Sequence, residues 1–155
     1  MSGPSPLHDL VPALRALHHA LLDESRAEYE RSHGPLSGPG HLLHLVAHDE
    51  AFAWLRVLSS LMVDLDTLVD EEPPASDEEA AAIRRELEET FSSSAPGGFW
   101  ERCSTLLQSP PVVMAYAQVR ACLARLPLQR PASDAADRLH AKHRWAVARR
   151  KQGVA

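Results

Sequence analysis

Apolar residues recur every three or four positions along most of the chain, which is the period of α-helices that bury one face. The stretches that carry this pattern are rich in Ala, Leu, Glu and Arg, all strong helix formers, and show almost no β-branched alternation. Clusters of Gly, Pro and Ser separate them at residues 32–40, 71–75, 92–98, 109–111 and 127–131. The pattern predicts an all-α protein, a single domain over 1–155 built as a bundle of five to six helices.

The first two predicted helices carry most of the expected core. The first runs from about His8 to Arg31, and the second from about His41 to Asp70. The second is apolar almost all round, and such a helix is either buried or shared with a partner on one side. We therefore expect a long central second helix that carries a homodimer interface or a groove. The apolar stripe of the first helix comprises Leu10, Val11, Leu14, Leu17, His18, Leu21, Leu22 and Tyr29.

The later helices have recognisable start signals. Ser76 and Glu79 fit a capping box, in which each side chain bonds the other residue's free backbone amide. A short helix is expected over about 98–108, and a fifth helix begins with Ser109 as its N-cap and Pro110 in its first turn. Residues 133–151 predict a last helix with a narrow apolar edge, so the basic C-terminal segment 133–155 is expected to dock loosely.

Composition narrows the class of protein. Of the 155 residues, 45% are apolar and 24% charged, which suits one globular domain and excludes global disorder. No apolar run is long enough to span a membrane, and the first ten residues lack the pattern of an export signal. We therefore expect a cytoplasmic protein that does not bind membranes, in which Cys103 and Cys122 are reduced thiols.

The net charge of −5 hides an uneven distribution. Residues 1–60 contain four basic and seven acidic side chains, residues 61–90 two and eleven, and residues 91–155 ten and three, so the segments carry −3, −9 and +7. The basic end lacks a stacking platform of several aromatic residues, which argues against nucleic acid as a partner. It is expected instead to pair with the acidic segment, within one chain or across a dimer.

Three histidines lie close together at the start of the second predicted helix. The offsets between His41, His44 and His48 place them on one helical face, where His44 and His48 can chelate a divalent metal such as Zn, Ni or Fe. A bundle site needs further ligands from facing helices. The candidates are Glu24, Glu28, His140 and His143. Alternatively, the three histidines simply line a polar edge.

Polar residues also fall on apolar faces. His18 lies in the core stripe of the first helix, and Glu50 and Asp64 fall among leucines and valines of the second. A buried carboxylate needs a partner, so a hydrogen bond between His18 and Glu50 is expected to fix the register of the two helices. Its functional alternative is an acid/base pair or a proton-sensitive switch. In a further alternative, Glu50 simply reaches solvent at the edge of the helix.

Two resemblances rest on particular segments. The stretches LHHALLDESRAEYERSHGPL and GHLLHLVAHDEAFAWLRVLSSLMVDLDTL resemble a family of small all-helical bacterial proteins for which no activity is known. The segment HLVAHDEAFAWL is similar to the second helix of DinB-like metal-binding bundles. That resemblance implies His44 or His48 as one metal ligand, with His140 and His143 as the others.

Motifs of common enzyme classes are missing from the sequence. There is no G-x-S-x-G elbow, no phosphate-binding P-loop, no G-x-G-x-x-G and no H-E-x-x-H. The leading hypothesis is a non-catalytic helical protein that acts in protein interaction or regulation as a homodimer. The alternative is a metal-binding bundle that uses the histidines of the second and last helices.

Overall fold

One long helix, α1 (Pro6–His33), organises the fold. The computed structural model describes residues 6–70, 74–92 and 98–128, and all regular secondary structure in these ranges is helical. Six shorter helices follow α1 in chain order. They are α2 (Pro39–His48), α3 (Glu50–Ala53), α4 (Arg56–Asp70), α5 (Asp77–Thr90), α6 (Phe99–Thr105) and α7 (Pro110–Ala124). The all-α prediction is confirmed, and the described ranges hold seven helices rather than five to six.

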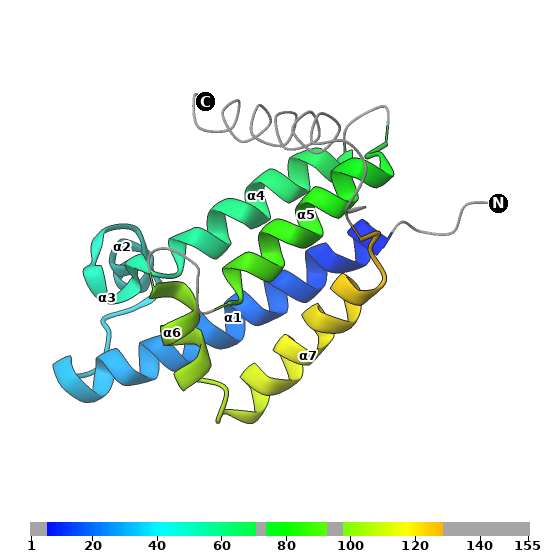
Figure 1. The fold of residues 1–155 in the computed structure, drawn as a ribbon. Coiled ribbons are helices and arrows are strands. Elements are labelled where there is room, and N and C mark those ends of the chain that lie inside the picture. The colour runs from blue at the N-terminus through cyan, green and yellow to red at the C-terminus, as the bar shows by residue number, and fades with distance from the viewer. Residues whose placement is uncertain (1–5, 71–73, 93–97, 129–155) are drawn as a thin grey trace.

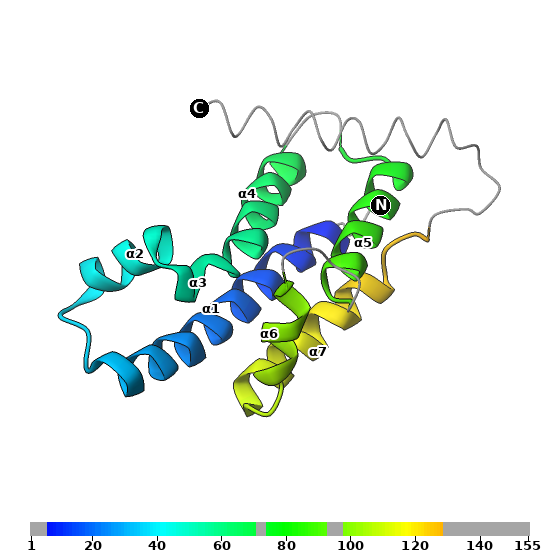
Figure 2. The same ribbon diagram turned by 60° about the vertical axis from the view of Figure 1, so that its left-hand side comes forward.

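Helix α1 packs most extensively against α7, and also against α4 and α3. Figures 1 and 2 both show α7 running alongside α1, with α5 and α6 completing that side of the molecule. In both views, α2 and α3 lie beyond the N-terminal end of α4, away from α7. The central helix is therefore α1, and the prediction of a long central second helix is wrong.

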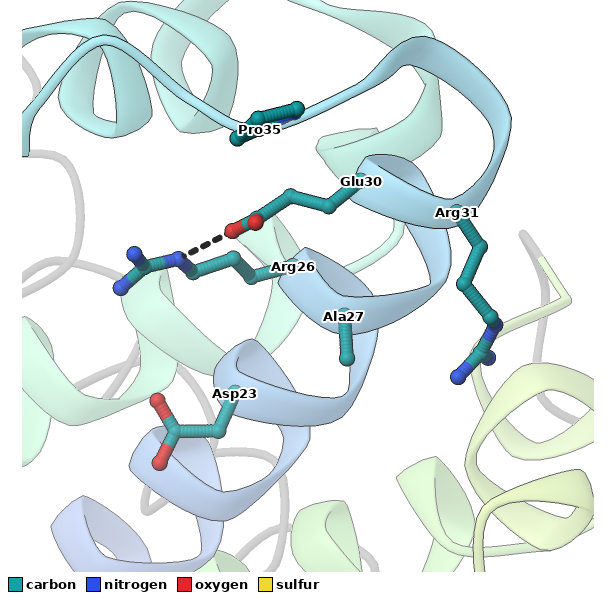
Figure 3. Close-up of a pocket in the computed structure, with 6 residues that line it drawn as sticks. All are labelled: Asp23, Arg26, Ala27, Glu30, Arg31 and Pro35. Carbon is teal, nitrogen blue, oxygen red and sulfur yellow. Dashed lines mark hydrogen bonds and ion pairs between the residues drawn. The ribbon is translucent and has the colours of Figure 1, made fainter.

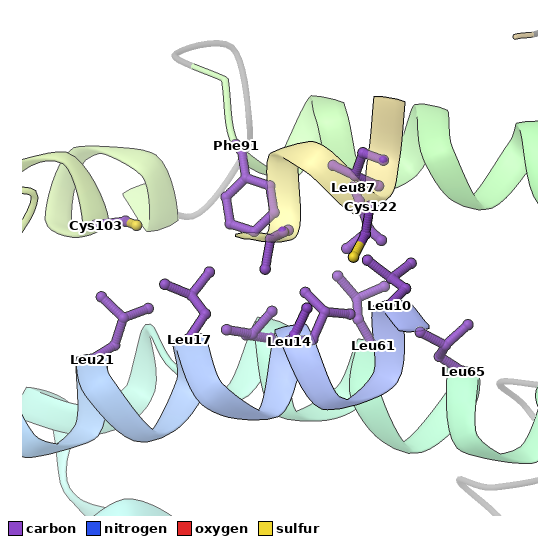
Figure 4. Packing of buried hydrophobic residues seen from close by; sticks show 14 of the residues in the cluster. Leu10, Leu14, Leu17, Leu21, Leu61, Leu65, Leu87, Phe91, Cys103 and Cys122 are labelled. Carbon is purple, nitrogen blue, oxygen red and sulfur yellow. The ribbon is translucent and has the colours of Figure 1, made fainter. Parts of the chain in front are cut away.

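The core is built on a leucine stripe of α1. Leu10, Leu14, Leu17 and Leu21 are completely buried, and they repeat at the three- and four-residue spacing of one helical face. Figure 4 shows these side chains directed toward α5, α6 and α7, with α4 beside them. Burying a leucine contributes roughly 1.5–3 kcal/mol relative to exposure. The surrounding residues labelled in the figure are Leu61, Leu65, Leu87, Phe91, Cys103 and Cys122.

The predicted second helix is broken into three, first at Asp49 and again at Trp54 and Leu55. The backbone of Asp49 is extended, and the Asp49 side chain accepts a hydrogen bond from the Ala51 N–H at 2.8 Å, which caps α3. Arg56 reaches back to donate to the carbonyls of Val46 at 3.4 Å and Asp49 at 3.5 Å. The side chains of Asp49 and Arg56 thus form hydrogen bonds with backbone groups that a continuous helix would pair internally. Aspartate is also more favourable at a helix cap than in a helix interior.

The start of α5 follows its prediction. Ser76 Oγ accepts from the Glu79 N–H, and Glu79 Oε1 accepts from the Ser76 N–H, each at 3.1 Å. The capping box is therefore confirmed. Ser109 occupies the N-cap position of α7 with Pro110 after it, as expected, but its hydroxyl makes no capping hydrogen bond. The predicted last helix and the segment 133–155 lie outside the described residues.

The leucine stripe generates a stability prediction. Leu14 is 0% exposed and lies at the middle of the stripe, so Leu14→Ala leaves a cavity among α1 and its neighbours. We expect it to lower the free energy of unfolding by about 3 kcal/mol, as measured by urea denaturation. The matched control is Leu43→Ala, because Leu43 is 71% exposed and is expected to change stability by less than about 0.5 kcal/mol. Equal effects of the two substitutions would contradict the assignment of the core.

Candidate functional site

The three histidines predicted to share a face all lie on α2, but they differ in environment. His44 and His48 are exposed, and their ring centroids are 4.8 Å apart with the ring planes inclined by 51°. His41 is half-buried, and its Nδ1 accepts a hydrogen bond from the Ser37 N–H at 3.2 Å. The structure therefore brings two of the three rings together and ties the third to the loop before α2.

The carboxylates proposed as further metal ligands have other partners. Glu28 Oε2 lies 3.3 Å from Arg102 Nη2 of α6, and Glu24 Oε1 accepts a hydrogen bond from Ser109 Oγ at 2.7 Å. Both interactions tie later helices to α1. His140 and His143 lie outside the described residues. Within the ranges that are described, no three His, Cys, Asp or Glu side chains gather closely enough to hold a metal ion.

His18 makes a hydrogen bond between two helices, but not with the predicted partner. Its Nε2 lies 2.8 Å from Ser59 Oγ of α4, and that hydroxyl also donates to the Leu55 carbonyl at 3.3 Å. Glu50 is exposed on α3, so the predicted buried pair of His18 and Glu50 is wrong. The sequence predicts His18 in the core stripe, and in the structure the ring is half-buried. The prediction missed Ser59 because a lone serine on a helix gives no sign of its partner.

The pair of His18 and Ser59 has the spacing of a catalytic base and nucleophile, yet its surroundings indicate a structural role. In the described part of the chain, no carboxylate bonds the His18 ring to orient it as in a Ser-His-Asp triad. Burial, and to a smaller extent the neighbouring His19, lower the pKa of His18 from its ordinary value of 6.5. The lowered pKa favours the neutral form of the ring, which is compatible with its hydrogen bond to the uncharged Ser59 hydroxyl between α1 and α4.

An open depression lies on the outer face of α1, toward its C-terminal end (Figure 3). It has a volume of about 650 Å³ and is lined by Asp23, Arg26, Ala27, Glu30, Arg31 and Pro35. Arg26 Nε and Glu30 Oε1 form an ion pair at 2.7 Å across one helical turn, and Asp23 lies 3.3 Å from His19. These paired charges match the wet face of an amphipathic helix, and the lining includes no nucleophile placed beside a base.

The two cysteines are buried free thiols on different helices, Cys103 on α6 and Cys122 on α7. Burial raises the pKa of Cys103 to about 11, so its thiol stays protonated near neutral pH. Cys122 Sγ lies 3.7 Å from the Asp9 carbonyl and 3.4 Å from Arg125 Nη2. Buried, protonated thiols are poor nucleophiles, so Cys103 serves packing rather than redox chemistry.

Helix α7 presents an apolar surface to solvent. Val112, Val119 and Leu123 are buried on the side that faces α1. The opposite side is also apolar, and we call it the α7 outer face. It consists of Pro110, Val113, Met114, Ala117, Ala121 and Ala124, all exposed. Met114 is 73% exposed and Val113 43%. The sequence feature that indicates this exposed apolar face is the low charge of the segment, because the 15 residues of α7 include a single charged residue, Arg120.

Two further observations bear on function. Within the described ranges, none of the helices has both the length and the apolar character needed to cross a membrane. Neither family models, nor curated proteins, nor solved structures give a match to the chain. The two resemblances noted in the sequence therefore stay predictions, and proposals about function depend on the residues themselves.

The lowered pKa of His18 predicts how stability depends on pH. The unfolded chain, with its ordinary His pKa, binds a proton more readily than the folded protein does, so stability rises with pH in this range. Acidification from pH 7.5 through 6.5 and below is therefore expected to lower the free energy of unfolding progressively. His18→Gln removes this contribution, and the matched control His8→Gln replaces an exposed histidine.

Urea denaturation at a series of pH values measures this effect. The wild-type protein and His8→Gln are expected to lose stability in parallel below pH 6.5, while His18→Gln shows a shallower dependence. Equal slopes for all three proteins would show that His18 is not buried in its neutral form in solution.

Proposed function

We propose that this protein is a non-catalytic interaction protein that acts as a homodimer through the α7 outer face. The observation that carries the proposal is the exposure of an apolar stripe along the whole of α7, in which Met114 is 73% exposed. Single exposed apolar residues are ordinary on soluble proteins, whereas contiguous apolar patches mark interaction sites. Leu128, beyond the end of α7, is also 68% exposed.

The side chains of the α7 outer face favour a second copy as the occupant. Ala117, Ala121 and Ala124 are small, so another helix can approach this side closely. In an antiparallel pair with its two-fold axis between positions 117 and 118, Met114 of each chain lies opposite Ala121 of the other. Because a two-fold axis repeats each contact, the large Met114 side chain packs against the small Ala121 side chain at two places in the interface. The outer face contains no acidic residue that would repel its copy.

The size of the surface sets the expected affinity. A helix of 15 residues is about 22 Å long. One stripe of this length buries roughly half of the 800 Å² per partner that a standard interface buries. We therefore expect a reversible dimer, with a dissociation constant on the order of 10 μM.

Charge on the outer face is expected to weaken the dimer. Met114→Asp places a carboxylate within the contact, where it faces Ala121 of the other copy and loses its hydration without gaining a partner. Sedimentation velocity over a concentration series should show the dissociation constant rising at least about tenfold. Because Met114 is exposed in the monomer, the variant is expected to keep the helical content and unfolding temperature of the wild-type protein.

Leu43→Asp is the matched control, since Leu43 is equally exposed but lies on α2. It is expected to dimerise like the wild-type protein. If Leu43→Asp dissociates the dimer and Met114→Asp does not, the interface lies on the segment of the predicted second helix instead. A wild-type protein that stays monomeric throughout the series removes the homodimer from the proposal.

A further inference from the structure

We propose that His44 and His48 form a binding site for a late first-row divalent metal ion on α2, with Ni²⁺ and Zn²⁺ as the ions that suit it. The two residues are one helical turn apart, both rings are exposed, and their centroids lie 4.8 Å apart. Imidazole nitrogens are the preferred ligands of these ions. The juxtaposition therefore supplies two ligands from a single helix.

The surroundings of the two rings leave room for the rest of the coordination sphere. Neither ring has a hydrogen bond or ion pair to another described side chain. Gly40 and Ala47 lie on the same side of α2, and the space beside Gly40 is open. Figures 1 and 2 show α2 at the end of the molecule, away from α7. Water molecules can thus occupy the remaining positions on the metal.

His41 is not part of the proposed site. It lies one turn before His44, but its Nδ1 is engaged by the Ser37 N–H and its side chain is half-buried. The described ranges provide no third ligand within reach of the pair. The proposed site therefore keeps the pair of His44 and His48 expected from the sequence, and it binds the metal through these two imidazoles without His41 or a ligand from a facing helix.

Metal binding at this position has a structural consequence for α2. A metal held by residues i and i+4 closes one turn of helix, so it binds the helical form and stabilises it. Helix α2 has ten residues, of which only Leu45 is buried, so its own packing holds it weakly. Ligation by His44 and His48 is expected to slow amide exchange at the C-terminal end of α2.

Calorimetric titration of the full-length, untagged chain with Ni²⁺ tests the proposal, and Zn²⁺ serves as a second probe. We expect one ion per chain, with a dissociation constant well below millimolar. Binding is expected to weaken in acid, because protons compete for the imidazole nitrogens. Hydrogen exchange with and without Ni²⁺ should show protection confined to α2. No binding below about 1 mM would overturn the proposal, as would a ratio of one ion per two chains.

Substitutions identify the ligands. His44→Ala/His48→Ala is expected to weaken Ni²⁺ binding at least about a hundredfold and to remove the protection of α2. His41→Ala and the matched control His8→Ala are expected to bind Ni²⁺ as the wild-type chain does. His140→Ala/His143→Ala is expected to behave like these controls. A comparable loss of affinity in that double variant would place the site between α2 and the C-terminal segment and overturn the two-histidine assignment.

Discussion

The packing of α7 against the leucine stripe of α1 is the contact on which the rest of the structure depends. Leu10, Leu14, Leu17 and Leu21 present one continuous apolar ridge, and α7 covers it with buried residues of its own. Two polar contacts, one near each end of the α1–α7 pair, fix the position of α7 along α1. Arg125 Nη1 bonds Asp9 Oδ2 at 3.1 Å near one end of the pair, and Ser109 bonds Glu24 at the other. Hydrophobic burial supplies the stability, and these exposed or half-buried bonds set the register.

An aromatic cluster extends this core toward α3 and α6. The rings of Trp54 and Phe99 lie 5.5 Å apart, and those of Phe91 and Phe99 5.7 Å apart, at tilted angles that the quadrupoles of aromatic rings favour. Arg102 lies over the Trp54 ring, with Cζ 5.6 Å from its centroid, and also pairs with Glu28. The short helices α3 and α6 have few residues, so aromatic and charged contacts together fasten them to α1. This anchoring does not extend to α2, in which only Leu45 is buried.

Helical periodicity predicted the class of fold and most of the core, because the burial of an apolar stripe is a local property of the sequence. The stripe of α1 and the capping box of Ser76 and Glu79 could both be recognised from local sequence. The break at Asp49 could not, since it depends on Arg56 reaching back to the end of α2. For the same reason the partner of His18 was predicted wrongly. Which polar groups meet across two helices depends on the tertiary packing, and one sequence pattern fits several pairings.

The pairing of the first and last described helices has a consequence for synthesis. Residues 34–109 separate α1 from α7, so the leucine ridge emerges from the ribosome long before its main cover exists. Contacts between distant segments form late because the intervening chain must be ordered first. Until α7 has been made, only the earlier helices α4, α5 and α6 can shield part of the ridge. The nascent chain therefore carries an exposed run of leucines through most of translation, the kind of surface that chaperones recognise.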